Sequence, residues 1–400
     1  MVLGGYICAS MREGRGNHSG SVRLPHDSVA QLVEQYTFNV WVLGSNPSGI
    51  TKWAEQASPK GSSHEVGASI TVFPNILFFF DSMDLPLLNP EWVFKPGHKS
   101  MVGDGFSVYH LFPGQQLPMQ RTDPFLMLDY NPPWEIKPSH QSKGVDVHPH
   151  RGFETVTLVY SGEVAHADSA GNQGIVGPGE VQWMHAASGI LHKEYQSEAF
   201  TASGGVFHMA QLWVNLPAQR KMDPPSYCSI HREQIQILPI PGGSLELVAG
   251  RLGQSADGSW SCLSDQDVVL ENSFQRMVSG AAPVCSPIWL FHWNQGDSHD
   301  QILELRVPGG ATVLALVVEG SLGGELEGVG NGHLVVFKRN LTDESSSIRV
   351  EALAGTKVLW MIGQPLNEPI AAYGPFVMNS KDQIQQAFED YQNGRFGVLN

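Results

Sequence analysis

The stretch "TVTLVYSGEV", residues 155–164, has the pattern of an apolar strand that runs into a glycine turn and a second strand. A weaker echo of it, "TVLALVVEGSL", occupies residues 312–322, some 157 residues further along the chain. Recurrence of one β-unit at such a distance indicates a duplicated β-domain, because each copy needs a core of its own.

From about residue 93 onward, the chain around both copies has the same pattern of short strands and turns. Short apolar stretches such as "FLMLDY" (125–130), "EVQWMHA" (180–186) and "AQLWVNL" (210–216) alternate with turns rich in Gly, Pro and Asn. Many closely spaced strands with almost no helix predict an all-β sandwich or barrel. The stretch 254–285 is polar and irregular, and we expect a long loop or an insertion there.

The C-terminal end departs from the β pattern. In "NSKDQIQQAFEDYQNG" (379–394), Ser380 is followed three residues later by Gln383, which is the spacing of a capping box. Gly394 is placed to end the helix. We expect the apolar face of this helix to pack against a barrel; it consists of Ile384, Ala387, Phe388 and Tyr391.

Residues 1–92 do not share the pattern of the rest. No single period runs through them, and "VAQLVEQYTFNVWVLGSNPSGIT" (29–51) resembles conceptual translations through transfer-RNA genes. We interpret this region as a non-family N-terminal extension. It is either poorly ordered or not native coding sequence, and we assign no chemistry to it.

Composition limits the class of protein. The chain has 400 residues, enough for two or three domains, and a formal net charge of -15 that disfavours nucleic acid and anionic membranes. The apolar run 70–80 is too short to span a bilayer. The four cysteines, Cys8, Cys228, Cys262 and Cys285, form no CxxC motif. We therefore expect no secretory signal, reduced thiols and a soluble, cytoplasmic protein.

Two pairs of polar residues point to a metal site. Residues i and i+2 of a strand share one face, so His148 and His150 in "HPHRGFETV" would lean together. The stretch "GILHKEY" (189–195) adds His192 and Glu194 with the same spacing. If the two pairs lie on neighbouring strands of a barrel, three imidazoles and one carboxylate converge.

Such a donor set suits a divalent first-row ion and leaves coordination positions open for chemistry. The absence of thiolate ligands argues against a structural zinc site. Other candidates stay open. Glu154 shares the face of His150 and could replace Glu194, and His185 could also be recruited. We interpret His166 and His208 as satisfied or surface histidines, and Arg151 as an anchor of its turn that bonds to carbonyls or a carboxylate.

Several segments, in order, resemble the signature of the pirin family: "DPFLMLDY", "HPHRGFETVTLVYSGEVAHADSAGN", "PGEVQWMHAASGILHKE", "QLWVNLP" and "EPIAAYGPFVMNS". The resemblance covers roughly residues 93–397, interrupted by 254–285. It implies a bicupin, that is, two tandem cupin (double-stranded β-helix, jelly-roll-like) barrels with iron in the first. It also implies His148, His150, His192 and Glu194 as ligands, and it favours Glu194 over Glu154.

On this basis we expect an N-terminal metal-binding barrel at 93–245, a C-terminal barrel at 246–378, and a helix and tail at 379–400. Counting back from Thr312 as the histidine pair lies back from Thr155 gives Leu305 and Val307. We therefore expect no metal in the C-terminal barrel, where the remaining histidines, His292, His299 and His333, are dispersed.

The resemblance implies two kinds of function. One is a metal-dependent dioxygenase of quercetinase type, with Fe(II) preferred and Ni, Cu, Mn or Zn as alternatives. Its partners would be a small aromatic, flavonol-like substrate and dioxygen, and Glu194 would accept the substrate hydroxyl proton. The alternative is a non-enzymatic, iron-binding redox sensor that contacts transcription factors, for which a nuclear location would fit a eukaryotic source. We prefer the enzyme.

Overall fold

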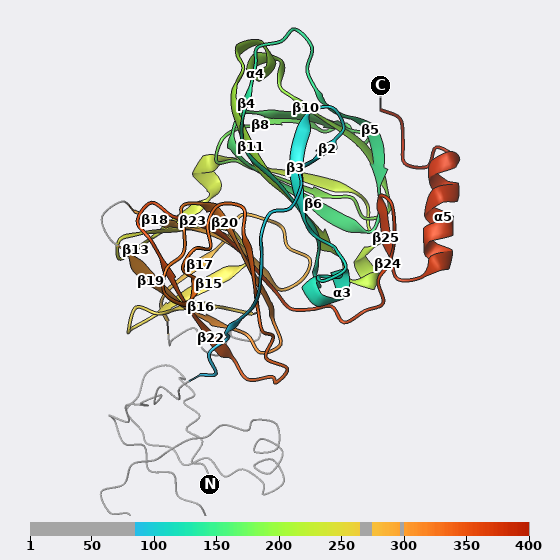
Figure 1. Cartoon of the computed structure of the whole chain (residues 1–400). Coiled ribbons are helices and arrows are strands. Elements are labelled where there is room, and N and C mark those ends of the chain that lie inside the picture. The colour runs from blue at the N-terminus through green and yellow to red at the C-terminus, as the bar shows by residue number, and fades with distance from the viewer. Residues whose placement is uncertain (1–84, 265–273, 297–299, 400) are drawn as a thin grey trace, which may run out of the picture. The chain divides into compact units, whose positions relative to one another are not determined.

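The computed structural model describes residues 85–264, 274–296 and 300–399 (Figure 1). The architecture is two tandem barrels of antiparallel strands followed by a C-terminal helix, which confirms the predicted fold class. Each barrel consists of a seven-stranded sheet faced by a smaller one. Residues 1–84, and with them most of the predicted extension, lie outside the described residues.

The N-terminal barrel contains the strands that carry the predicted site. Its larger sheet consists, in spatial order, of β12 (Ser226–Ile230), β9 (Val181–His185), β6 (Phe153–Ser161), β11 (Gly205–Asn215), β4 (Phe125–Ile136), β3 (Phe106–Phe112) and β2 (Ser100–Val102). Its smaller sheet consists of β5 (Gly144–His150), β10 (Ile190–Gln196), β7 (Val164–Asp168) and β8 (Gln173–Val176).

The C-terminal barrel repeats this plan with apolar strands. Its larger sheet consists of β1 (Pro90–Phe94), β21 (Leu334–Phe337), β20 (Thr312–Glu319), β23 (Lys357–Gly363), β18 (Ile288–Gln295), β14 (Gly243–Ala249) and β13 (Gln236–Ile240). Its smaller sheet consists of β17 (Phe274–Ser279), β15 (Arg251–Ser255), β16 (Trp260–Cys262), β19 (Gln301–Val307) and β22 (Ser346–Ala352).

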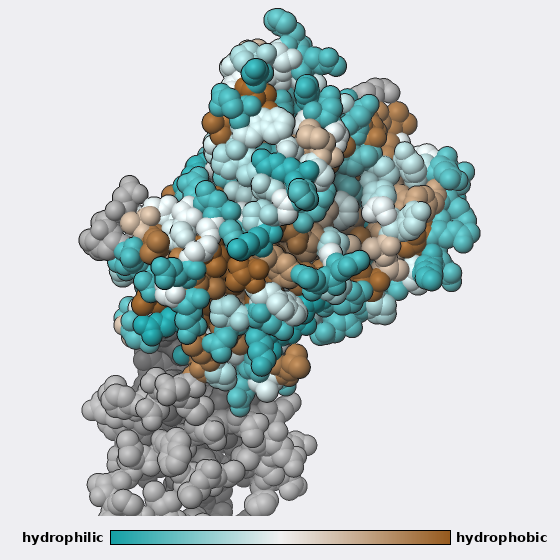
Figure 2. Space-filling model, viewed as in Figure 1, coloured by the Kyte–Doolittle hydropathy of each residue, from teal (hydrophilic) through white to brown (hydrophobic). Residues whose placement is uncertain are grey.

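The helices are short except for the last. They are α3 (Met119–Thr122), α4 (Glu198–Ser203), α5 (Lys381–Gln392) and the 3-10 turns η2 (Ala218–Arg220), η3 (Arg232–Gln234) and η5 (Gly324–Leu326). Among the described residues, no helix is both long enough and apolar enough to cross a membrane. The face drawn in Figure 2 is largely hydrophilic, and hydrophobic residues gather near the junction of the barrels.

The two large sheets pack against each other, which explains why residues 155–159 of "TVTLVY" are all buried. Val156 and Leu158 of β6 belong to a core that also contains Leu314 and Leu316 of β20. The alternate residues of β6 face the interior of their own barrel, where Val159 joins a second apolar cluster. The strands of the predicted repeat therefore form the seam between the barrels.

Both predicted boundaries of the N-terminal barrel differ from the structure. β1 starts at Pro90 and pairs with β21, and Leu88 is buried in the core of the C-terminal barrel. At the other end, β13 pairs with β14 and β14 with β18, so residues 236–249 belong to the C-terminal barrel. The reason is hydrophobic burial, because Leu238, Leu245 and Leu247 join the same core.

The stretch 254–285 was predicted to be a long loop or an insertion, but parts of it form strands. β15 pairs with β16 and β17, and β16 pairs in parallel with β19. Trp260 and Cys262 are buried in the core of the C-terminal barrel, which holds this stretch in the sheet despite its polar composition. Residues 265–273 of the predicted loop lie outside the described residues.

The C-terminal helix α5 confirms the capping prediction. The Ser380 hydroxyl accepts from the Gln383 backbone N–H, and the Gln383 side chain accepts from the Ser380 N–H. Ile384, Ala387 and Phe388 pack against the hairpin formed by β24 (Ala371–Tyr373) and β25 (Phe376–Met378). Tyr391 lies at the edge of this face: the residue is 40% exposed, and its ring centroid is 6.5 Å from that of Phe376. The helix lies beside the N-terminal barrel (Figure 1).

Candidate metal centre

The β5–β10 pair brings the predicted histidines together. The register places His148 opposite His192, and His150 opposite Ile190. On β10 the buried positions alternate, so His192 and Glu194 face inward together, as their spacing predicts. The register shifts between His192 and Glu194, where a β-bulge interrupts the pairing with β5.

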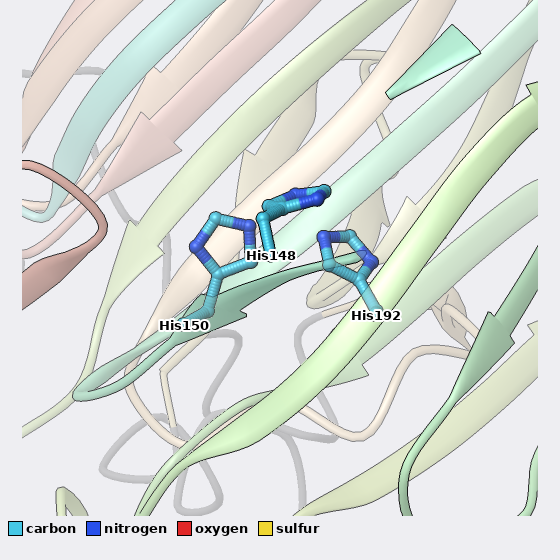
Figure 3. A group of neighbouring side chains, drawn as sticks. All are labelled: His148, His150 and His192. Carbon is cyan, nitrogen blue, oxygen red and sulfur yellow. The ribbon is translucent and has the colours of Figure 1, made fainter. Parts of the chain in front are cut away.

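The three imidazoles form one compact group (Figure 3). The ring centroids are 4.2 Å apart for His148 and His192, 4.7 Å for His150 and His192, and 4.9 Å for His148 and His150. One ligand nitrogen from each residue lies within 4.8 Å of the other two. His150 and His192 are buried, and His148 is partly exposed, so the group is reached from the His148 side.

The electrostatics favour the neutral form of the two buried imidazoles, His150 and His192. Burial, and after it the neighbouring His148, hold the pKa of His150 well below its usual range. Burial and the other two histidines do the same to the pKa of His192. A neutral imidazole offers the lone pair that a metal needs.

The hydrogen bonds of the histidines also fit a metal. Both ring nitrogens of His192 and Nδ1 of His150 are buried without a hydrogen-bond partner. Buried polar atoms normally have a hydrogen-bond partner, so these unpaired nitrogens indicate a binding site for a cation. The His148 Nδ1 lies 2.7 Å from the Asp146 carbonyl oxygen, to which it can donate, leaving Nε2 as the ligand atom. Three imidazole nitrogens without a thiolate match a divalent first-row ion.

Glu194 is close to this group but is held apart from it. Its carboxylate is not among the ligand atoms that lie within 4.8 Å of one another. The Gln211 amide nitrogen donates to its oxygens at 3.0 and 3.2 Å, and the Thr157 hydroxyl donates at 3.4 Å. Burial raises the pKa of the Glu194 carboxyl, whereas the electrostatic interaction with His148 and the hydrogen bonds from these two donors lower it.

Gln211 and Thr157 were missed by the sequence reasoning. Both interrupt apolar strands at inward-facing positions, Gln211 in "AQLWVNL" and Thr157 in "TVTLVY". A polar residue at such a position is a signal of a partner across the barrel. The two polar residues at inward-facing positions were visible in the sequence, but their common partner, Glu194, is known only from the structure.

Arg151 anchors the end of β5 as predicted. Its Nε donates to the Ser188 carbonyl at 2.7 Å, and its Nη1 donates to the Asp390 carboxylate at 2.8 Å. The guanidinium also lies over the Phe396 ring, 4.6 Å from its centroid. Because Asp390 belongs to α5, the C-terminal helix braces the strand that carries His148 and His150.

The alternative ligands lie elsewhere. Glu154 and His185 pair with each other and with Cys285, in a group separate from the three histidines. His208 is satisfied by the Tyr130 hydroxyl at 2.9 Å, and His166 bonds to the Tyr227 hydroxyl. Of the four predicted ligands, the structure brings His148, His150 and His192 within reach of one ion, while the alternatives Glu154 and His185 lie in a separate group.

In the C-terminal barrel, the positions equivalent to the histidine pair hold core residues. Leu305 and Val307 lie on β19 and are each 1% exposed. His292 is bonded to the Tyr160 hydroxyl, and His333 to the Gly330 carbonyl oxygen. His299 lies outside the described residues.

The chain is similar to known proteins along most of its length. The pirin family model matches residues 105–214, and the pirin C-terminal cupin domain matches 297–397. A Pseudomonas aeruginosa protein named "Putative quercetin 2,3-dioxygenase PA2418" is 40% identical over 76% of this chain and 96% of its own. A pirin-like protein of Caulobacter vibrioides is 32% identical over 69% and 88%, respectively.

Among solved structures, the crystal structure of quercetin 2,3-dioxygenase from Acinetobacter baumannii superposes with a TM-score of 0.66. It is 36% identical and covers 78% of this chain and 100% of that one. Family models, relatives and this structure agree, and both barrels are matched. The chain belongs to the pirin family.

Proposed function

We propose that this protein is a metal-dependent dioxygenase of quercetinase type that acts on flavonol-like substrates. The observation that carries the proposal is the convergence of three imidazoles, two of which, His150 and His192, have buried nitrogens without partners. His148, His150 and His192 would bind the ion, with Glu194 as the fourth ligand. Fe(II) is the preferred ion, and Ni, Cu, Mn and Zn are alternatives. The names of the related proteins support the substrate class.

The bound ion supplies a Lewis acid and, if redox-active, a route for electrons to dioxygen. The protein supplies an enclosed site that is reached from one side. His150 and His192 are buried, whereas His148 borders solvent, so a planar substrate would enter past His148. The mouth of the site, rather than its interior, then selects the substrate.

Glu194 is the proposed general base. Burial raises the pKa of its carboxyl toward the working range of a base that must both accept and release a proton. It would accept the proton of the flavonol 3-hydroxyl, leaving the substrate as its more electron-rich anion. A positioned base of this kind contributes about 10²–10⁴-fold to the rate.

Gln211 and Thr157 are the proposed positioning residues for that carboxylate. Their hydrogen bonds stabilise the ionised form and therefore oppose the effect of burial. A Gln211→Leu variant would lose two of the donor contacts. We expect its pH–rate profile to shift to higher pH, because the pKa of Glu194 rises when the donor is removed.

The test is oxygen uptake with quercetin after anaerobic loading of the purified protein with Fe(II). We expect iron-dependent uptake in the native protein and a fall of about 10²–10⁴-fold in Glu194→Gln. Glu304→Gln is the matched control, because Glu304 is an exposed residue of β19 in the other barrel. Iron content measured on each variant separates loss of a ligand from loss of a base.

Tightly bound iron with no uptake in the native protein would contradict the dioxygenase. That result would favour the iron-binding regulator, and partner binding in the two redox states would then be the measurement. Unchanged oxygen uptake in Glu194→Gln would instead support the dioxygenase but show that Glu194 is not its general base.

A further inference from the structure

Glu154, His185 and Cys285 form a cluster between the barrels. Glu154 on β6 and His185 on β9 are directly opposed in the antiparallel pairing of the N-terminal barrel. Cys285 comes from the segment between β17 and β18 of the C-terminal barrel. One ligand atom from each residue lies within 4.8 Å of the other two.

The contacts within this cluster are close, and its two inner members are almost fully buried. His185 Nδ1 lies 2.9 Å from the Glu154 Oε1, and the Cys285 Sγ lies 3.8 Å from the same nitrogen. Glu154 is 1% exposed and His185 is 6% exposed. The His185 Nε2 is buried and has no partner. A carboxylate buried this deeply requires partners, and here they are an imidazole and a thiol.

We propose that Glu154, His185 and Cys285 bind a divalent metal ion of the zinc class at the seam between the two barrels. Carboxylate oxygen, imidazole nitrogen and thiolate sulfur are all zinc ligands, and three of them leave one position open. The thiolate distinguishes this site from the histidine group, because sulfur favours softer ions. The two sites therefore differ in which metal they select.

Metal binding at this cluster has a defined proton balance. Burial, and after it the Glu154 carboxylate, raise the pKa of the Cys285 thiol to about 12, so the free site holds the thiol protonated. When the ion binds, Cys285 loses its proton to solvent, and the resulting thiolate becomes a ligand. One proton is released for each ion bound.

The neighbouring charges allow the cation. Ionised Glu154 and Cys285 carry two negative charges, which balance a divalent ion. Arg220 interacts electrostatically with both, and this interaction opposes the ion. However, Arg220 is already bonded to the Asp223 carboxylate, which offsets its charge. Because the ligands come from both barrels, a bound ion would connect them.

The test is titration of the metal-free full-length protein with Co(II), which reports sulfur ligation through a near-ultraviolet thiolate-to-cobalt absorption band. We expect this band to appear and to reach a plateau as Co(II) is added, with Co(II) at the histidine group contributing nothing to it. It should be lost in Cys285→Ser and in Cys285→Ala, and be kept in Cys228→Ser. Cys228 is the matched control, because it is a partly buried cysteine of β12, the strand that pairs with β9.

The second readout is thermal unfolding with Zn(II). We expect Zn(II) to raise the melting temperature of the native protein and of Cys228→Ser, and to raise it less in Cys285→Ser. No thiolate band in the native protein, or a band that persists in Cys285→Ser, would overturn the proposal. It stands independently of the dioxygenase proposal, because the histidine group contains no sulfur and contributes nothing to this band.

Discussion

The two barrels share one strand pairing, but the inward-facing residues are polar in the N-terminal barrel and apolar in the C-terminal barrel. In the N-terminal barrel, the β5–β10 pair places His148 opposite His192. In the C-terminal barrel, the β19–β22 pair places Leu305 opposite Ile348. The same correspondence relates His150 to Val307 and Glu194 to Val350. Every one of these C-terminal positions belongs to the apolar core of that barrel.

The rest of the C-terminal interior follows the same rule. Trp289, Trp293 and Trp360 are nearly fully buried there and fill the space between the sheets. The N-terminal barrel has an apolar cluster around Phe106 and Phe207, but its other half holds imidazoles, Glu194 and Gln211. One barrel therefore places imidazoles and a carboxylate at inward-facing positions, whereas its neighbour places apolar side chains at the equivalent positions.

The largest expected effect is on metal content. His192→Ala should abolish iron retention, because it removes the ligand that lies closest to both of the other rings. Secondary structure should be preserved, since the apolar cores remain. Iron measured by elemental analysis after loading and desalting checks this. Stoichiometric iron in this variant would show that the histidine assignment is wrong.

The matching substitution in the other barrel should act on stability alone. Ile348→Ala removes a side chain that is 1% exposed and should lower the free energy of unfolding by about 2–5 kcal/mol. Iron content should stay at the native level. Urea unfolding combined with elemental analysis measures both. Iron loss without destabilisation would break the proposed division between the barrels.

A smaller effect is expected on the pH dependence of stability. Burial, and after it Lys357, lower the pKa of His292 to about 3, against about 6.5 in the unfolded chain. Between these values the unfolded chain holds more protons, so the free energy of unfolding rises with pH. The contribution of this group is at most ~1.4 kcal/mol per pH unit.

His292→Gln keeps an acceptor for the Tyr160 hydroxyl and removes the titration. We expect a shallower decrease in stability between about pH 6.5 and pH 4, measured by urea unfolding. His208 and His166 of the N-terminal barrel have pKa values lowered to about 4, chiefly by burial, and keep part of the slope. An unchanged slope of the free energy of unfolding against pH would show that His292 does not contribute to the pH dependence.

The smallest effect should be confined to one side of the molecule. Ser380→Ala removes the N-cap of α5 and should cost about 1 kcal/mol. Because α5 packs on β24 and β25 and braces Arg151, faster amide exchange should appear in those elements. Exchange in β19 and β22 should not change. Uniformly faster exchange would mean that α5 stabilises both barrels alike.

The fold class, the C-terminal helix and the residues of the histidine group could all be predicted from sequence patterns. The physical reason is that each depends on local spacing. A strand period of two places His148 with His150, and the capping box specifies the start of α5. The contrast between His148 and Leu305 was also readable, because the two copies can be aligned by their apolar strands.

Which sheet a strand joins, and which distant side chains meet, could not be read from the sequence pattern. β1 and β13 joined the C-terminal barrel because long-range pairing and burial, rather than their local pattern, select their sheet. Gln211 was found beside Glu194, and Cys285 beside Glu154 and His185, through contacts between segments far apart in sequence. Local periodicity fixes which face a side chain occupies. Packing of whole sheets fixes what that side chain meets.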